Sequence, residues 1–234
     1  MRTNLSRRDF LAASTTLAAG LGFGLSAIIP GRAHAADPVF KTKLRKALII
    51  SQPTEDKLKR LKDAGFDGLE AGILPPAEAE ACRKTAEKLG LRIHSVLRGW
   101  AEFNSDDPAK VEKTFAVTED ALRAAQAYGA DAVLLVPCRI SGMKMPAPRQ
   151  FAIKFDEKTG HLTRAVAGDN APYADYIKAH NHAVDTSREA VKRLIPLAEK
   201  CGVVIALENV WNNLWVQPPV FRNFVASFKS PWVK

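Results

Sequence analysis

The sequence passes from a helix-like stretch through glycine into an apolar run four times, in nearly the same way each time. A glycine that closes a helix, followed at once by apolar residues, marks a helix end and the start of a strand. Strands and helices that alternate through short connections predict a parallel sheet. The regular repeat favours a (β/α) barrel over a doubly wound sheet. The junctions are A-G-F-D-G-L (64–69), L-G-L-R-I-H (89–94), Y-G-A-D-A-V (128–133) and C-G-V-V-I-A (201–206).

Five strands and five helices follow from this alternation and from the hydrophobic periodicity. Thr54 is the expected N-cap of the first helix, because its hydroxyl can accept from the first free backbone N–H groups. The preceding turn, Ser51-Gln52-Pro53, has no glycine, which argues against a dinucleotide or phosphate loop there. We expect strands at 44–50, 66–71, 91–97, 132–137 and 203–207, and helices at 54–64, 76–89, 108–128, about 185–200 and 217–228.

A long interruption, residues 138–182, separates the fourth strand from its helix. Residues 151–155 and 161–166 flank a turn at 156–160, which predicts a β-hairpin. An insert at the carboxyl end of a strand is either a lid or pocket wall, or a decorative surface hairpin. The sequence leaves both interpretations open.

The first 35 residues have the pattern of an export signal. S-R-R-D-F-L (6–11) matches the twin-arginine pattern, a weakly apolar stretch follows, and Ala33-His34-Ala35 is an A-x-A cleavage site. We therefore predict a twin-arginine signal peptide at 1–35, a mature domain at 36–234, and a periplasmic or secreted protein. The alternative is a permanent N-terminal anchor; no other segment is predicted to span a membrane.

The formal net charge of +9 is spread along the predicted helices. Because no tract of basic and aromatic residues appears, we expect no nucleic-acid partner. The length suits one domain with a sizeable core. Whether the protein forms a homo-oligomer stays open.

The segment 203–213 (V-V-I-A-L-E-N-V-W-N-N) holds the strongest candidate for a functional residue. Five apolar residues, typical of a strand buried on both faces, run directly into Glu208. An ionised carboxylate in such a place must be paired, hydrogen-bonded or bound to a metal. Since α/β proteins keep their chemistry at the carboxyl ends of parallel strands, we expect Glu208 to be catalytic.

Four segments together resemble the sugar phosphate isomerase/epimerase superfamily, whose fold is the xylose isomerase-like TIM barrel. They are F-D-G-L-E-A-G (66–72), L-R-I-H-S-V (91–96), Y-G-A-D-A-V-L-L-V-P (128–137) and I-A-L-E-N-V-W-N-N (205–213). The resemblance covers residues 44–234 and implies an α/β fold of the (β/α) TIM-barrel type with about five of its eight βα units. Residues 230–234 resemble the lead-in to a sixth strand, so we expect a truncated, N-terminal part of the barrel.

The resemblance also implies a divalent metal ion (Mg, Mn, Co or Zn) at the barrel mouth, held by two Glu, an Asp and a His or Gln. Glu208 matches the first of these ligands, which in the family can also act as acid or base. The other three ligands come from later strands. Such a metal polarises the carbonyl of a keto sugar and stabilises an enediolate, while a base moves the proton between carbons.

The implied function is the isomerisation or epimerisation of a sugar or sugar derivative, with a small-molecule sugar as the partner. The same chemistry also serves a lyase or hydrolase acting on keto-sugars, inositol derivatives or C-glycosides. A third hypothesis is an inactive truncated fragment or a sugar-binding relic, and we expect this chain to be inactive by itself.

Glu70 and His94 are candidate substrate-binding residues near predicted strand ends, and we expect both to point into the same mouth as Glu208. Glu70 either binds a sugar hydroxyl, caps the next helix or meets a lysine. His94 either donates to a substrate oxygen or is a satisfied core histidine. His180 and His182 (H-N-H) suggest a metal role, which a polar helix start explains equally well.

Four more residues near the strand ends are candidates for contacting the sugar. Trp100 and Trp211 either stack on a ring face or pack at the rim. Asn209 and Asn212 flank Glu208 and are expected to position it or the substrate.

Overall fold

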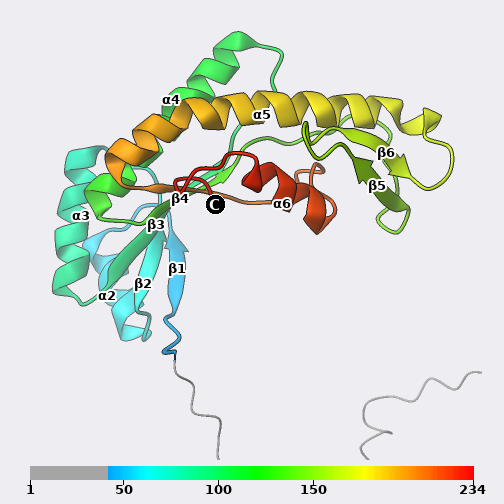
Figure 1. Ribbon diagram of the computed structural model, residues 1–234. Helices are drawn as coiled ribbons and strands as arrows, with labels where there is room; N and C mark the ends of the chain where they lie inside the picture. The colour runs from blue at the N-terminus through cyan, green and yellow to red at the C-terminus, as the bar shows by residue number, and fades with distance from the viewer. Residues whose placement is uncertain (1–41) are drawn as a thin grey trace, which may run out of the picture. The chain divides into compact units, whose positions relative to one another are not determined.

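Five parallel strands stand side by side in the order β1-β2-β3-β4-β7, which is also their order along the chain (Figure 1). The computed structural model describes residues 42–234, so the predicted signal peptide lies outside the described residues. The strands are β1 (Ala47–Ile50), β2 (Gly68–Ala71), β3 (Arg92–Trp100), β4 (Ala132–Val136) and β7 (Val204–Leu207). The helices are α2 (Glu55–Asp63), α3 (Pro76–Lys88), α4 (Pro108–Tyr128), α5 (Ala174–Cys201) and α6 (Pro218–Ala226).

The helix ends form as their residues predict. Thr54 is the N-cap of α2, and its hydroxyl accepts from the Lys57 backbone N–H (3.4 Å). Gly129 and Gly202 close α4 and α5 in the left-handed conformation, with φ of 66° and 67°. Because glycine adopts this conformation without steric cost, the chain can turn from each helix directly into the next strand.

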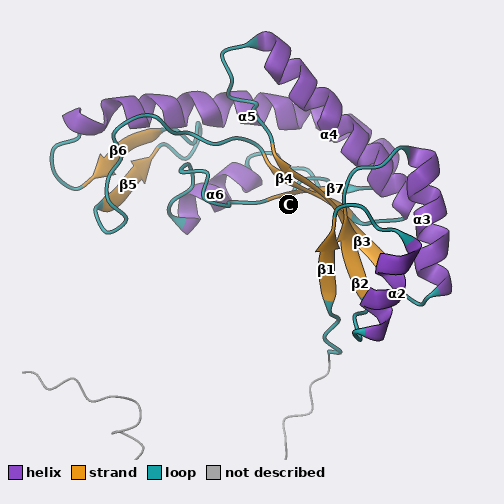
Figure 2. Cartoon of the chain, turned by 180° about the vertical axis from the view of Figure 1, so that it is seen from behind, coloured by secondary structure: helices purple, strands orange, loops and turns teal. Residues whose placement is uncertain are grey.

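The helices α2, α3 and α4 lie along one face of the sheet (Figure 2). In β4, Val133 and Leu135 are fully buried, whereas Ala132 and Leu134 are only half-buried. The alternation recurs in β7. The expectation that 203–207 is buried on both faces is therefore wrong, because in the described residues the helices cover one face and leave the other partly open.

The last residues extend the sheet past β7. The Ile205 N–H donates to the Trp232 carbonyl (2.8 Å), and the Lys234 N–H donates to the Ile205 carbonyl (3.0 Å). Val233 thereby pairs with Ile205 in parallel. This isolated bridge lies where the sequence predicts the lead-in to a sixth strand.

The predicted hairpin is present between β4 and α5. Its strands β5 (Phe151–Phe155) and β6 (Leu162–Val166) pair antiparallel. The helix after it begins at Ala174, following a short 3₁₀ turn, η1 (Ala171–Tyr173), and not near residue 185 as expected. The buried residues Tyr176, His180 and Ala183 continue the apolar stripe of α5 towards its start, so the polar H-N-H segment lies inside the helix.

The hairpin lies against α5 and α6 (Figure 1). The Asn181 side chain accepts from the Leu162 N–H (2.7 Å) and donates to the Leu162 carbonyl (3.2 Å). Arg188 of α5 donates to the Thr159 carbonyl (2.6 Å), and Asn223 of α6 donates to the Glu157 carbonyl (2.9 Å). The insert is thus bound to both helices by side-chain hydrogen bonds.

Within residues 42–234, none of the helices combines the length and the hydrophobicity needed to span a membrane.

Candidate active site at the carboxyl end of the sheet

Glu208 lies directly after β7, at the carboxyl end of the parallel sheet. Its backbone N–H donates to the Leu135 carbonyl (2.9 Å), so the pairing with β4 continues to this residue. By strand alternation its side chain is on the same, partly open face as Ala206. It is half-buried, and within the described part of the chain no hydrogen bond or ion pair joins its carboxylate to another residue. A carboxylate in this state is available to a ligand.

The two asparagines predicted beside Glu208 shape the loop that follows it. The Asn209 side chain donates to the Trp215 carbonyl (2.7 Å). The Asn212 side-chain oxygen accepts from the Leu214 N–H (3.1 Å), and the Asn212 backbone carbonyl accepts from the Ile140 N–H (3.0 Å). Because these side-chain atoms already form hydrogen bonds within the loop, contacts of Asn209 and Asn212 with a substrate remain predictions.

Trp211 protrudes from the same loop. Its side chain is 85% exposed, and its backbone has a positive φ of 33°. A non-glycine residue with positive φ is uncommon, and such backbone strain is concentrated at functional sites. The loop borders a hollow of about 400 Å³, whose lining is Met145, Pro146, Pro148, Phe151, Asn209, Trp211, Asn212, Asn213, Trp215 and Val216.

Trp100 ends β3 and is 42% exposed. The Arg139 guanidinium lies over its ring, 5.8 Å from the ring centre. Arg98 turns away to α4, where it donates to the Thr118 hydroxyl (3.0 Å) and the Thr114 carbonyl (3.3 Å). Burial lowers the pKa of Arg98. Arg98 therefore joins α4 to β3. Arg139 and Trp100 lie at the rim, at the carboxyl end of β3.

Glu70 and His94 form a separate cluster with Ser95. The Ser95 hydroxyl donates to Glu70 Oε1 (2.9 Å), and its oxygen lies 2.8 Å from His94 Nδ1. Because the hydroxyl has one proton and gives it to the carboxylate, Nδ1 of His94 must carry the proton of the second bond. Glu70 is 8% exposed. We call Glu70, Ser95 and His94 the Glu70 cluster.

The Glu70 cluster and Glu208 are offset along the strands of the sheet. Ser95 pairs with Ala132, which pairs with Val204, and Glu208 follows Val204 by four residues. Four residues of strand span roughly 13 Å. His94 also lines a hollow together with the starting residues of β1, β2 and β3. His94 is the third residue of β3, which runs on to Trp100, so it lies towards the amino end of that strand. Glu70 is the third of the four residues of β2. A mouth shared by these residues and Glu208 remains a prediction.

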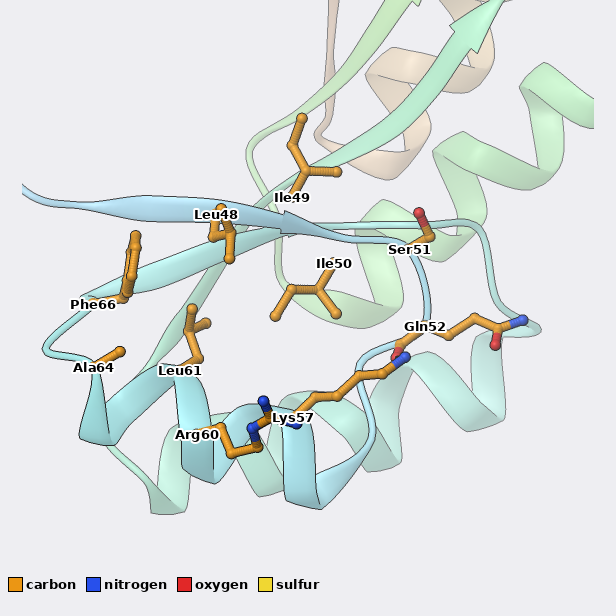
Figure 3. Close-up of a pocket in the computed structure, with 10 residues that line it drawn as sticks. All are labelled: Leu48, Ile49, Ile50, Ser51, Gln52, Lys57, Arg60, Leu61, Ala64 and Phe66. Carbon is orange, nitrogen blue, oxygen red and sulfur yellow. The ribbon is translucent and has the colours of Figure 1, made fainter.

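A larger hollow, of about 560 Å³, lies between β1 and α2 (Figure 3). Leu48, Ile50, Leu61 and Phe66 give it an apolar wall, and Lys57 lies at its border. In the described residues β1 pairs with β2 alone, so this hollow belongs to an open sheet edge. It contains none of the residues predicted to act on a substrate.

Comparison with known proteins agrees with this architecture. A family model described as xylose isomerase-like TIM barrel matches residues 58–234. The chain belongs to the xylose isomerase-like TIM barrel family. No curated protein matches the sequence significantly.

Solved structures similar to this xylose isomerase-like barrel include three sugar epimerases, all at low sequence identity. They are YcjR from E. coli, a 3-keto-D-glucoside 4-epimerase (TM-score 0.58, 13% identity, 82% of this chain and 67% of that chain); a D-psicose 3-epimerase with D-fructose (0.56, 15%, 82% and 62%); and an L-ribulose 3-epimerase (0.56, 19%, 82% and 59%). These likenesses show the fold. The matches span between 59% and 67% of the neighbours' lengths.

The described residues of this xylose isomerase-like barrel do not complete a metal site. No group of three or more His, Cys, Asp or Glu residues within 42–234 is placed to hold an ion. Glu208 by itself is a single carboxylate, whereas hard divalent cations take several oxygen ligands. The H-N-H segment offers no substitute, because His180 is fully buried whereas His182 is exposed on another side of α5.

Ser95 was not predicted from the sequence, which also left open whether the insert forms a pocket wall; the structure places the insert in the wall of the hollow beside Glu208. Ser95 follows His94 directly, and the register that pairs it with Glu70 depends on a bulge in β3. Met145 and Phe151 come from the insert, far from the loop in sequence. An aromatic residue at the start of the predicted hairpin was the available signal for such a wall.

Proposed function

We propose that the protein isomerises or epimerises a sugar or sugar derivative, with Glu208 transferring a proton at a carbon beside a carbonyl group. One observation carries this proposal: Glu208 is a half-buried carboxylate without a described partner, at the carboxyl end of a parallel strand. Active sites of this barrel type lie at that end. The sugar epimerases among the structural neighbours support the substrate class.

In this proposal Glu208 acts first as a general base and then as a general acid. Its carboxylate removes the proton from the carbon next to the carbonyl, and the electron pair of the C–H bond moves into an enediolate. Return of the proton by Glu208 to the neighbouring carbon, on the same face, gives an isomer. An epimer requires a second acid that delivers a proton to the opposite face of the enediolate. Positioned acid–base catalysis of this kind contributes about 10²–10⁴ in rate.

The metal dependence and the ligand role of Glu208 belong to the proposal. Since the described residues do not form a complete site, we derive no reaction step through a metal. The ligand role has its own test: binding of Mn²⁺ to the protein and to Glu208→Gln. Equal affinity of both for Mn²⁺ would remove Glu208 from the ligand set without touching its role as a base.

The test of the reaction follows deuterium uptake from D₂O into D-psicose, D-fructose and 3-keto-glucosides by NMR. It uses this chain and, in parallel, the chain extended by further strands that complete a barrel. We expect exchange beside the carbonyl in the extended form, and a loss of at least about 100-fold in Glu208→Gln. Glu189→Gln, the same change at an exposed position of α5, is the matched control.

Exchange that persists in Glu208→Gln would overturn the proposal. Exchange in the extended form but not in this chain would agree with the alternative hypothesis, in which this chain is an inactive fragment. Loss of a leaving group in place of reprotonation would identify a lyase or hydrolase.

We also propose export by the twin-arginine route, on the basis of the S-R-R-D-F-L pattern and the A-x-A site. Replacing Arg7 and Arg8 by lysine should leave the precursor in the cytoplasm. Normal export of that variant would contradict the proposal and favour a different route or an anchor.

A further inference from the structure

The hollow beside Glu208 combines aromatic walls with amide groups. Trp211 and Trp215 come from the loop after β7, and Phe151 and Met145 come from the insert. We propose that this hollow binds an aromatic, oxygen-bearing aglycone, so the substrate is a glycoside and not a free or phosphorylated monosaccharide. The inference rests on the proposed function, because it names the substrate class of the same mouth.

The exposed ring of Trp211 is the first argument. Its side chain is 85% exposed on a backbone with φ of 33°, beside a hollow that it helps to line. A large aromatic side chain left in water in a strained conformation has given up burial that other large apolar residues obtain. Stacking against a flat ligand restores that burial and adds the favourable geometry of an aromatic pair.

Two unpaired donors are the second argument. Among the described residues, four buried side-chain atoms have no hydrogen-bond partner, and two of them, Asn212 Nδ2 and Trp215 Nε1, belong to residues that line this hollow. The Leu214 N–H binds Asn212 Oδ1 and so fixes the amide with Nδ2 as the free group. Both atoms are donors and are themselves buried. Binding that exposes them to the hollow therefore favours a ligand with acceptors such as ether, carbonyl or phenolic oxygens.

The absence of charge is the third argument. No Lys, Arg, Asp or Glu belongs to the described lining of the hollow. A phosphate there would lose its hydration without gaining a charged partner, which is unfavourable. The volume of about 400 Å³ lies in the usual range for small-molecule pockets and accommodates an aromatic ring.

The walls are fixed relative to one another by hydrogen bonds. The Tyr176 hydroxyl donates to the Asn213 carbonyl (3.0 Å), and the Asn213 side chain donates to the Ile140 carbonyl (2.7 Å). Gln217 joins the loop to the hairpin through the Phe151 carbonyl (3.2 Å). A preformed site loses less conformational entropy on binding, which favours selective recognition of a rigid ring.

The experiment compares phenyl β-D-glucoside, methyl β-D-glucoside and glucose 6-phosphate as ligands of the full chain, by isothermal titration calorimetry. We expect the phenyl glucoside to bind at least about tenfold more tightly than the methyl glucoside, with the phosphate weakest. Trp211→Ala and Met145→Ala, one on each wall, should each reduce the preference for the phenyl group several-fold. Leu44→Ala removes an equally exposed apolar side chain, 87% exposed, outside the hollow and should leave the preference unchanged.

Equal affinities for the phenyl and methyl glucosides would overturn the inference. A phenyl preference that survives both wall variants would place the aglycone elsewhere and overturn it as well. These outcomes are separate from those of the proposed function. If deuterium exchange needs Glu208 but the phenyl glucoside is not preferred, the proposed function stands and the aglycone site is rejected. If the phenyl glucoside is preferred but no exchange occurs, the aglycone site stands and the proposed function is rejected.

Discussion

Two polar regions of one sheet differ in how completely their side chains bond to one another. On β2 and β3, Glu70, Ser95 and His94 form a continuous chain of hydrogen bonds. At the carboxyl end, the Glu208 carboxylate has no partner within the described residues, and Asn212 Nδ2 is buried without one. The side chains of the first region are bonded to one another. The second contains groups whose bonding capacity is unused.

The difference separates a structural role from a functional one. Buried polar groups in folded proteins are nearly always hydrogen-bonded, so each exception needs a reason. Glu70 has a partner within the protein, because the Ser95 hydroxyl donates to its Oε1. Glu208 and the loop after it are explained by a ligand. Three predictions test whether this division holds.

The largest expected effect concerns His180, which lies beneath the loop after β7. It is 0% exposed, and its Nε2 makes no hydrogen bond of ordinary geometry. Burial lowers its pKa from 6.5 to about 4; Asn181 and the Leu214 backbone oppose this shift only partly. Between these pH values the unfolded chain binds a proton that the folded chain does not. The free energy of unfolding should therefore fall as pH drops from about 6.5 to 4, by up to about 3 kcal/mol.

Urea denaturation at several pH values measures this loss. His180→Gln should flatten the part of the profile between about pH 4 and 6.5, whereas His182→Gln, two residues along α5 but exposed, should not. Identical profiles for the wild type and His180→Gln would show that the loop region does not hold a costly buried imidazole. The comparison between the two regions would then rest on Glu208 alone.

Most of the fold follows from local signals in the sequence. The four glycine junctions placed the four strands that follow a helix, and the Pro108 and Gly129 boundaries gave α4 its observed limits. The start of α5 could not be read in the same way. Its first turns carry polar residues, and it is burial of Tyr176 and His180 in the tertiary structure that continues the helix there. Tertiary packing overrode the local pattern.

Of the candidate site residues, only the one whose position depends on a single strand end could be placed from the sequence. Glu208 follows an uninterrupted apolar run, so its place needs no knowledge of neighbouring strands. Glu70 and His94 depend on the register between β2 and β3, which shifts between Leu69 and Glu70. A second shift lies between Leu97 and Gly99. Bulges like these leave little trace in a single sequence and move side chains along the sheet.

The next prediction sets Glu70→Ala against Glu208→Ala. Loss of the Glu70 carboxylate leaves the buried Ser95 hydroxyl without its acceptor, which should cost about 1–3 kcal/mol of unfolding free energy. Loss of the Glu208 carboxylate breaks no described bond and should change stability by less than about 0.5 kcal/mol. Chemical denaturation at pH 7 measures both. Equal losses would show that Glu208 is bonded within the protein and would weaken its assignment as the free base.

The smallest effect tests whether the division applies to regions or to single groups. Asn209 belongs to the mouth loop, yet its side chain is satisfied, since Nδ2 donates to the Trp215 carbonyl (2.7 Å). If pairing decides the role of each group, Asn209→Ala should cost about 1 kcal/mol, the usual worth of one hydrogen bond, although it adjoins Glu208. Asn212→Ala removes the hydrogen bond that Oδ1 accepts, but it also removes the buried Nδ2 that has no partner. The variant should therefore lose less unfolding free energy than one that removes a buried amide with all its bonds made. Denaturation curves of both variants give the answer. No loss in Asn209→Ala would mean that the loop is held by other contacts, and that its amides face a ligand as the sequence first suggested.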